Sequence, residues 1–283
     1  MLKQLSPKGP DPVTYSWFLC GSPWPVLIIT AGYILSVPYG KRWMSKRREP
    51  FDLRLPIVLY NFAAVLVNAY VVFLSLRTIT ARPYRIYCQR VLHGKDDIYL
   101  SEAVWWYFIS KAFEFWDTWF FILTKKFTHI SILHVYHHAT MFPLWYLATR
   151  YTPGGEVAFP VIVNACVHIV MYSYYGLAAM HIQRKQLARV KLFVTIMQIS
   201  QFIAAAVGCT FRFHAMLFKN DKTCYDFPVL FVLIFLAHSI SLLFLFLNYF
   251  FQEYILKRNQ KRREPKLNII KTKNGYIKTA KDE

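Results

Sequence analysis

Long runs of apolar residues, separated by short polar stretches, dominate the pattern of this chain. A bilayer core about 30 Å thick is crossed by roughly 20 mostly apolar helical residues. Windows of that length, or close to it, cover about residues 22–39, 56–77, 101–123, 131–149, 157–179, 190–212 and 228–251. The pattern therefore predicts an all-α integral membrane protein with seven transmembrane helices.

The composition of the 283 residues agrees with this prediction. Hydrophobic residues make up 55% of the chain, aromatic residues 18% and charged residues only 17%, and the formal net charge is +19. A soluble domain usually carries about 25% charged residues, and a disordered chain has few aromatic residues. The positive mean hydropathy of +0.27 also argues against a basic nucleic-acid-binding protein.

The positive charge gathers on one side of the predicted bundle. With seven spans the termini face opposite sides, and the side of the C-terminus holds about two thirds of the 34 Lys and Arg residues. Because basic residues accumulate in cytosolic loops, we expect a lumenal or external N-terminus (1–21), a membrane domain (22–251) and a basic cytosolic tail (252–283). Such charge attracts lipid headgroups, and it would also steer a phosphate-bearing substrate to this face.

Four predicted spans carry polar or ionisable side chains, which are unfavourable inside a bilayer and indicate a functional site. Helical periodicity places the members of each group on one face of their helix. The groups are Lys111, Glu114, Asp117 and Thr118 in KAFEFWDT; His134, His137 and His138 in HVYHH; Asn164, His168, Tyr172 and Tyr175 in NACVHIVMYSYY; and Thr195, Gln198 and Gln201 in TIMQISQ.

All four groups fall in the cytosolic half of their spans when depth is counted at 1.5 Å per residue. Helices with polar faces at one depth turn them toward a shared interior, so we predict a polar chamber open to the cytosol. The lumenal half is expected to be lined only by aromatic and aliphatic side chains, which suits a long acyl chain. Purely structural roles, such as a Lys111–Glu114 ion pair or hydrogen bonds between helices, remain alternatives for individual residues.

The spacing of HVYHH fits two chemistries. Imidazoles bind metal in membrane di-iron desaturases and hydroxylases, but those sites need several histidine boxes, and the other histidines of this chain are isolated. Alternatively, imidazole serves as the nucleophile or general base of acyl transfer. Cys166 lies about 200° around the helix from His168, which disfavours a thiol nucleophile. A non-enzymatic receptor or transporter is a third hypothesis, and it leaves HVYHH unexplained.

Taken together, these motifs resemble the eukaryotic very-long-chain fatty acid elongases, the 3-oxoacyl-CoA synthases of the endoplasmic reticulum. The motifs KxxExxDT, LHVYHH, NxxxHxxMYSYY and TxxQxxQ occur here in order, and the likeness runs from about Ser22 to Phe251. Among the branches of the family, the chain is most similar to animal type-4-like and polyunsaturated fatty acid elongases, which share HVYHH and MYSYYGL.

The resemblance implies seven helices, six of them forming an inverted barrel around a narrow acyl tunnel closed at the lumenal end. It implies that a long-chain acyl-CoA and malonyl-CoA react to give a 3-oxoacyl-CoA, CO2 and CoA by a ping-pong acyl-imidazole mechanism, without a metal or other cofactor. His137 matches the acylated histidine. His168 is then expected to help decarboxylation and condensation, while His134 and His138 assist and orient.

The resemblance also implies which residues bind substrate. Those expected to shape the chamber and hold the thioester and malonyl groups are Lys111, Glu114, Asp117, Thr118, Asn164, Tyr172, Tyr175, Gln198 and Gln201. Cys88 and Cys224 map to lumenal loops, where a disulfide is stable, and the likeness supports their pairing. The expected partners, besides membrane lipids, are the ketoreductase, dehydratase and enoyl reductase of the elongation cycle; a homo- or hetero-oligomer is left open, and no nucleic acid is expected.

Two stretches depart from the family pattern. His129 stands where family members usually have Gln, and LARVKLFVT stands where WWKKYLT is common. Both lie at the predicted cytosolic mouth, so they bear on contacts with CoA and on chain preference rather than on the reaction.

Overall fold

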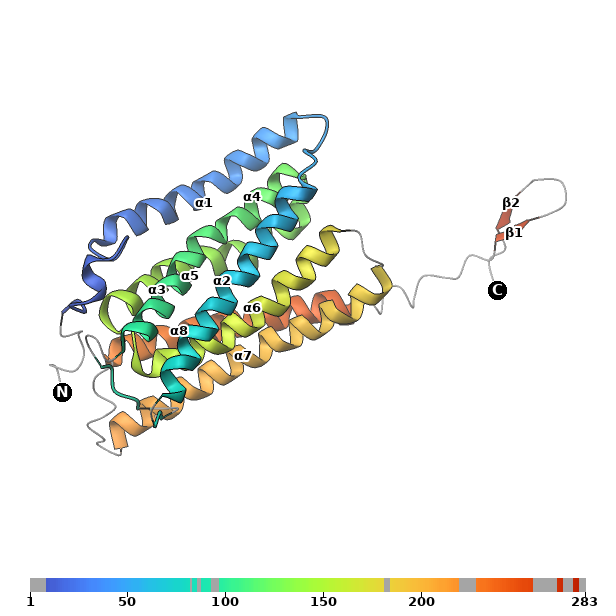
Figure 1. The fold of residues 1–283 in the computed structure, drawn as a ribbon. Helices are drawn as coiled ribbons and strands as arrows, with labels where there is room; N and C mark the ends of the chain where they lie inside the picture. Colours follow the sequence, from blue (N-terminus) through green and yellow to red (C-terminus); the bar gives the residue numbers. More distant parts are fainter. Residues whose placement is uncertain are drawn as a thin grey trace.

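The computed structural model describes residues 9–81, 83–85, 88–92, 97–180, 184–218, 228–256, 269–271 and 277–279. Its body is a bundle of long helices (Figure 1). They are α1 (Pro23–Lys46), α2 (Arg54–Thr80), α3 (Ile98–Phe113), α4 (Phe115–Leu123), α5 (Ile132–Tyr151), α6 (Ala158–Ala179), α7 (Arg184–Phe218) and α8 (Val229–Phe250). Six of the seven predicted windows each fall mainly on one helix, and the window 101–123 falls on both α3 and α4.

Short elements connect or extend the helices. They are the 3₁₀-helices η2 (Thr14–Ser16), η4 (Phe127–His129) and η5 (Gly155–Val157), and the π-helical turn η7 (Phe251–Leu256), which continues α8. In the tail, β1 (Ile269–Lys271) and β2 (Ile277–Thr279) pair antiparallel. The body is therefore all-α, as predicted, and the pair of short strands in the tail is an addition to that prediction.

Four helical segments of the described chain are long and apolar enough to cross a bilayer: Arg54–Thr80, Gly155–Ala179, Leu187–Phe218 and Val229–Leu256. Large hydrophobic side chains such as Trp24, Phe62 and Phe244 are exposed on the outer faces of the helices. Soluble monomers rarely expose extensive apolar surface. These two features identify a membrane protein.

The window 101–123, expected as one helix, is divided at Glu114 into α3 and α4. The Glu114 amide still donates to the Ser110 carbonyl, 2.9 Å away, but the Asp117 amide donates to the Glu114 carbonyl only three residues back, at 3.2 Å. Such a bond tightens the helix locally. The Glu114 side chain remains inside the bundle, where only 3% of the residue is exposed.

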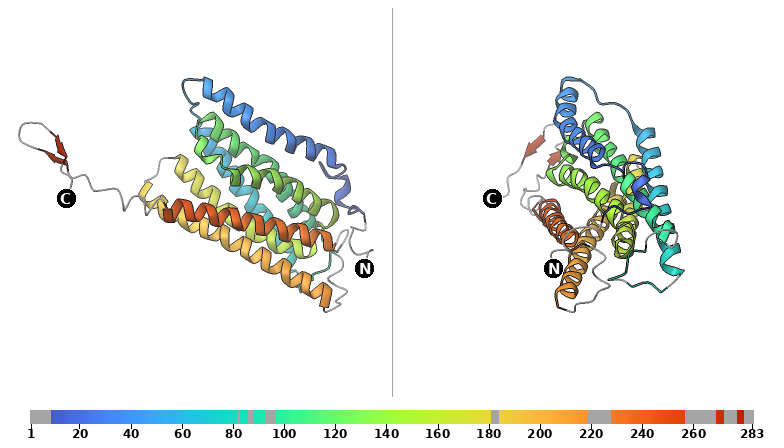
Figure 2. Two further views of the ribbon diagram at one scale, coloured as in Figure 1. Left: turned by 180° about the vertical axis from the view of Figure 1, so that it is seen from behind. Right: turned by 90° about the vertical axis from the view of Figure 1, so that its left-hand side faces the viewer.

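The helices follow one another around a common interior. α2 packs against α3 and α6, α3 against α5, α5 against α8, α8 against α7, and α7 against α6, which closes a ring. α1 lies outside that ring and packs against α4 and α5. The right-hand view of Figure 2 looks roughly along the helices and shows α1, in blue, at the edge of the bundle.

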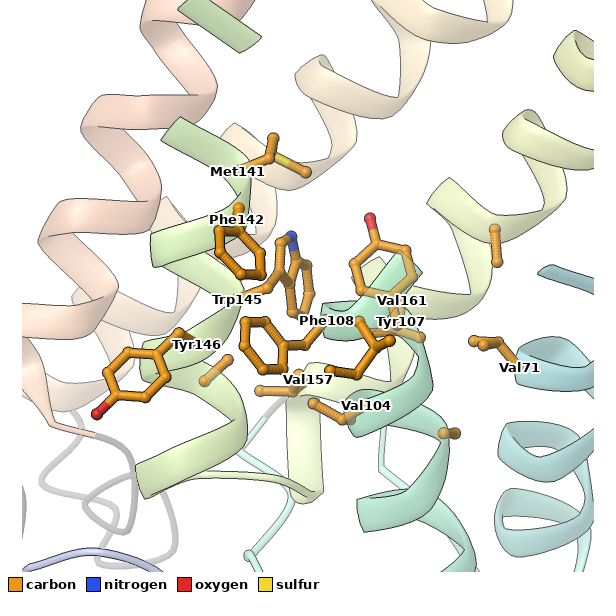
Figure 3. Packing of buried hydrophobic residues seen from close by; sticks show 14 of the residues in the cluster. Val71, Val104, Tyr107, Phe108, Met141, Phe142, Trp145, Tyr146, Val157 and Val161 are labelled. Carbon is orange, nitrogen blue, oxygen red and sulfur yellow. The ribbon is translucent and has the colours of Figure 1, made fainter. Parts of the chain in front are cut away.

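Aromatic packing joins α3 to α5 inside the ring (Figure 3). The rings of Phe108 and Phe142 stack with their centroids 5.0 Å apart, and the Tyr107 and Trp145 rings meet edge to face at 4.5 Å. Residues three or four positions apart share one face of a helix. This packing therefore fixes the spacing between the polar residues that lie one turn away on the same two helices.

Candidate active site

The carboxylate of Glu114 lies at the centre of the polar groups that the sequence singles out. Lys111 Nζ donates to Glu114 Oε1 at 2.6 Å, and His168 Nδ1 lies 3.3 Å from the same oxygen. His138 Nδ1 lies 4.0 Å from the other carboxylate oxygen, Oε2. All four residues are buried. Residues from three separate segments, 111–114, 138 and 168, thus converge on one carboxylate.

His168 is held through one of its two ring nitrogens. Its Nδ1 lies 3.4 Å from Lys111 Nζ as well as 3.3 Å from Glu114 Oε1. An ammonium group only donates and a carboxylate only accepts, so Nδ1 accepts from Lys111 in one tautomer and donates to Glu114 in the other. In both cases Nδ1 is engaged by the protein, which leaves Nε2 as the nitrogen for a substrate.

The histidine motif occupies the first two turns of α5. Ser131 caps this helix, because its hydroxyl accepts from the His134 amide at 3.2 Å. The imidazole rings of His134 and His138 lie 4.5 Å apart, and those of His137 and His138 lie 5.2 Å apart. Helix periodicity alone places His134 and His138 on one face, as predicted.

His137 differs from the other three histidines of the site. His134 Nε2 lies 2.8 Å from Thr118 Oγ1, while His138 and His168 approach Glu114. Within the described residues the His137 imidazole forms no hydrogen bond, and the side chain is half-buried. Among the four histidines, only the His137 imidazole thus has neither a hydrogen bond nor a close approach to a carboxylate within the described residues.

Two further hydrogen-bonded groups connect the surrounding helices. The Tyr172 hydroxyl on α6 donates to Asp117 Oδ2 on α4 at 2.9 Å. The Tyr107 hydroxyl on α3 donates to Asn164 Oδ1, and Asn164 Nδ2 donates to Gln201 Oε1 on α7 at 3.0 Å. These bonds hold the polar faces of four helices against one another.

Tyr107 was not among the residues expected from the sequence. Besides its bond to Asn164, its ring lies under the Lys111 ammonium, with Nζ 4.2 Å from the ring centroid. Tyr107 precedes Lys111 by four positions, so helical spacing places the two on one face. That spacing was the signal available in the sequence.

Three predicted substrate-binding residues belong neither to the Glu114 cluster nor to these two hydrogen-bonded groups. Gln198 Nε2 lies 3.4 Å from Met171 Sδ, and Tyr175 is exposed, with its ring 6.2 Å from that of Tyr172. Thr118 is 0% exposed and lies between two hydrogen-bonding partners, one of which is His134. Substrate contacts of Gln198 and Tyr175 stay predictions, whereas the burial of Thr118 favours a supporting position.

An apolar cavity of about 560 Å³ begins next to these groups. Met141, one helical turn beyond His137, and Asn164, one turn before His168, both line it, as does Gln201. Along α7 it continues from Gln201 to Ala215, which is about 21 Å at 1.5 Å per residue. Its lining includes Trp145, Val157, Phe202, Val232 and Phe235. A long hydrocarbon chain fits these dimensions and this chemistry.

The far end of this cavity contradicts the expectation of a purely aromatic and aliphatic lining. Arg212 Nη1 on α7 pairs with the carboxylate of Glu156 in η5, and both residues line the cavity together with His214. Arg212 is buried and Glu156 is nearly so. The two charges compensate each other, which is the condition for burying them. Sequence periodicity did not reveal the pair because its members belong to different helical segments.

Replacing Arg212 with Met should destabilise the protein by about 3–5 kcal/mol, because it leaves the Glu156 carboxylate buried without its partner. The double variant Arg212→Met with Glu156→Gln should recover most of that loss, since both charges are then removed. Thermal unfolding of the purified proteins in detergent micelles measures both effects. A single variant as stable as the wild type would contradict the expectation, as would a double variant no more stable than the single one.

The described cysteines are not part of the Glu114 cluster, although Cys209 lines the apolar cavity. Cys88 is disulfide-bonded, whereas Cys20, Cys166 and Cys209 are free thiols. Cys224, the partner that the family resemblance implies, lies outside the described residues. Cys166 is exposed, so it points away from the interior, as its helical position relative to His168 predicts. Among the described residues no three His, Cys, Asp or Glu side chains are arranged to hold a metal ion.

The chain has clear relatives among known proteins. The model of the ELO family, described as the GNS1/SUR4 family, matches residues 18–262. The chain is 37% identical to very long chain fatty acid elongase 4 of Homo sapiens over 268 residues, which cover 94% of this chain and 82% of that protein. It is 34% identical to very long chain fatty acid elongase 2 of Mus musculus over 279 residues, covering 95% and 88%. It is 33% identical to very long chain fatty acid elongase 5 of Xenopus laevis over 273 residues, covering 96% and 88%.

Proposed function

We propose that this chain, which belongs to the ELO (GNS1/SUR4) family, is a condensing enzyme of fatty acid elongation. It joins a long-chain acyl-CoA to malonyl-CoA and releases a 3-oxoacyl-CoA two carbons longer, CO2 and CoA. The observation that carries the proposal is the position of the His137 imidazole, which has no hydrogen bond in the described chain and lies one turn from an apolar cavity of about 560 Å³. Its ring also lies 5.2 Å from that of His138, which approaches the buried Glu114 carboxylate.

In the first half of the cycle the acyl chain lies in the cavity and its thioester lies beside His137. A ring nitrogen of His137 attacks the thioester carbonyl carbon, the carbon–sulfur bond breaks, and the proton of the imidazole leaves with CoA. The product is an acyl-imidazole and free CoA. Covalent catalysis of this kind divides one difficult step into two easier ones, and no hydrogen bond to the described chain has to be broken before His137 attacks.

In the second half malonyl-CoA takes the place of CoA and loses CO2, and the electron pair of the broken carbon–carbon bond forms an enolate. His168 Nε2 is suited to stabilise the enolate oxygen, since Nδ1 is already fixed by Glu114 and Lys111. The enolate carbon attacks the acyl carbon, the bond to His137 breaks, and the imidazole recovers a proton from water. The residues of the chain supply all of these groups, so no metal or other cofactor is required.

The membrane arrangement belongs to the same proposal. The four long apolar helices, together with α1, α3–α4 and α5, would make seven spans, with the six-unit ring forming a barrel around the acyl tunnel. Basic residues are frequent in the loop after α1, in the loop between α4 and α5, and in the C-terminal tail. This distribution supports a cytosolic C-terminus and a lumenal N-terminus. We place the protein in the endoplasmic reticulum membrane, where the ketoreductase, dehydratase and enoyl reductase of elongation would take over its product.

Microsomes that express the protein, supplied with labelled malonyl-CoA and acyl-CoAs of graded length and unsaturation, test the function. The expected result is label in products two carbons longer, above the level of microsomes without the protein, with the accepted substrates including polyunsaturated chains. Oxygen-dependent turnover without malonyl-CoA, with stoichiometric iron in the purified protein, would instead indicate a desaturase or hydroxylase. Ligand-coupled signalling or transport without acyl-CoA chemistry would indicate a receptor or transporter.

A further inference from the structure

α1 lies outside the ring, yet one of its side chains reaches the histidine motif. Tyr33, at the middle of α1, is only 4% exposed. Its hydroxyl lies 2.9 Å from Thr118 Oγ1 on α4, and Thr118 Oγ1 lies 2.8 Å from His134 Nε2 on α5. Two hydrogen bonds in series therefore connect α1 to the first histidine of HVYHH.

The surroundings restrict how this series can rearrange. The Tyr33 ring stacks on Phe115 with centroids 4.2 Å apart and planes 9° from parallel, and it meets the His138 ring edge-on at 6.4 Å. Thr118 is 0% exposed, so its hydroxyl has no route to water. Buried hydroxyl groups nearly always have a hydrogen-bond partner, and the partners of the Thr118 hydroxyl are Tyr33 and His134.

The direction of the hydrogen bonds follows from the groups involved. A threonine hydroxyl has one hydrogen to donate and two lone pairs to accept with. A phenol is a stronger donor than an aliphatic alcohol, and a neutral imidazole nitrogen is the strongest acceptor of the three groups. The favoured series therefore runs from the Tyr33 hydroxyl to Thr118 Oγ1, and from the Thr118 hydroxyl to His134 Nε2. With Nε2 accepting, the ring proton of His134 is on Nδ1.

We propose that Tyr33 and Thr118 are positioning residues that hold His134 in one orientation and one tautomer for the condensation reaction. The His134 ring contacts the His138 ring at 4.5 Å, and the His138 ring contacts that of His137 at 5.2 Å. Through these two ring contacts, the orientation of His134 affects that of His137, the histidine that we assign as nucleophile. The proposal rests on the proposed function, moves Thr118 from substrate binding to support, and gives the helix outside the ring a part in catalysis.

The inference is tested with variants of the whole chain in microsomal membranes that lack single hydroxyl groups. Tyr33→Phe keeps the ring on Phe115 and removes only the donor, while Tyr39→Phe makes the same change at a residue of α1 that is 71% exposed. Tyr33→Phe should lower kcat about two- to tenfold, the effect expected of one hydrogen bond, with an unchanged KM for acyl-CoA. Tyr39→Phe should match the wild type.

A second pair of variants separates the hydroxyl of Thr118 from its packing. Thr118→Ser keeps the hydroxyl and should retain most of the wild-type kcat, whereas Thr118→Val keeps the shape and should lose activity. Adding Tyr33→Phe to Thr118→Val should cause no further loss, because the series is already broken. Thr118→Ser and Thr118→Val also test whether the Thr118 hydroxyl is needed for activity if Tyr33→Phe does not accumulate in the membrane.

Three results would overturn the inference. One is an unchanged kcat in Tyr33→Phe while the wild type is active. Another is a Thr118→Ser variant as impaired as Thr118→Val, which would show that packing and not the hydroxyl matters. The third is the absence of malonyl-CoA-dependent condensation by the wild type, which overturns the proposed function and this inference with it. Because that third result is read on the wild type alone, the two failures are distinguishable.

Discussion

Replacing His137 with alanine is expected to abolish condensation while the protein remains folded in the membrane. The His137 imidazole is half-buried, forms no hydrogen bond within the described chain, and lies one turn from Met141 at the start of the apolar cavity. Its removal takes away the atom that bonds to the acyl group and little else. Loss of an enzyme nucleophile lowers turnover on the order of 10³-fold or more. Incorporation of labelled malonyl-CoA by microsomes measures the loss.

The matched variant is Cys166→Ala, which removes the free, exposed thiol two positions before His168 on α6. It should retain wild-type condensation, because the exposed Cys166 side chain faces away from the Glu114 cluster. Size-exclusion chromatography of both variants checks that they are folded. Retained malonyl-CoA incorporation in His137→Ala would remove His137 from the reaction, and its loss in Cys166→Ala would return a thiol to consideration.

Replacing Glu114 with glutamine is expected to damage both stability and activity. The exchange keeps the shape of the side chain but leaves the Lys111 ammonium, which is buried and 2.6 Å from Glu114 Oε1, without its counter-charge. Breaking a buried ion pair in this way costs about 3–5 kcal/mol. His138 and His168 lose the carboxylate that they share, so turnover should fall as well. Thermal unfolding and malonyl-CoA incorporation measure the two effects separately.

A double variant, Lys111→Met with Glu114→Gln, separates those effects. It removes both charges, so it should recover most of the stability that Glu114→Gln loses. Activity should stay low, because the carboxylate next to His168 is still missing. A Glu114→Gln protein that unfolds at the wild-type temperature would contradict the assignment of a buried ion pair. Recovery of activity along with stability would mean that the pair serves folding alone.

The sequence predicted well where the helices lie and which polar residues share a helix face, because both depend on short-range periodicity. His134 and His138 share a face of α5, and Asn164, His168 and Tyr172 share a face of α6, as positions four apart in a helix must. The unfavourable placement of such groups in lipid pointed to a common interior. In the structure their partners come from other segments of the bundle: Glu114 between α3 and α4, Asp117 on α4 and Gln201 on α7.

Contacts between distant segments were beyond the reach of periodicity. Tyr33 lies on α1, whose outer and inner residues are almost equally apolar, so nothing in the pattern indicates which way its one buried tyrosine turns. The pair of Arg212 and Glu156 was missed for a similar reason. Each residue alone resembles a charge at the end of a span, and only the packing of α7 against the start of α6 brings the two together.

Helix continuity is a further point at which sequence and structure differ. The apolar window 101–123 contains neither glycine nor proline to mark a break. The helix is nevertheless divided at Glu114, whose carbonyl accepts from the amide of Asp117, three residues later. The break coincides with the residue whose carboxylate Lys111, His138 and His168 approach. A cluster of side chains that depends on one irregular turn is visible only in the folded chain.

The measurement that tests the central claim most directly is the release of CoA from acyl-CoA when malonyl-CoA is withheld. Purified protein mixed rapidly with a long-chain acyl-CoA should release one equivalent of CoA per protein and then stop. Mass analysis after rapid quenching should find the acyl group on the peptide that contains His137, and later addition of malonyl-CoA should discharge it as 3-oxoacyl-CoA. The absence of CoA release without malonyl-CoA, or an acyl group on any residue other than His137, would contradict this account.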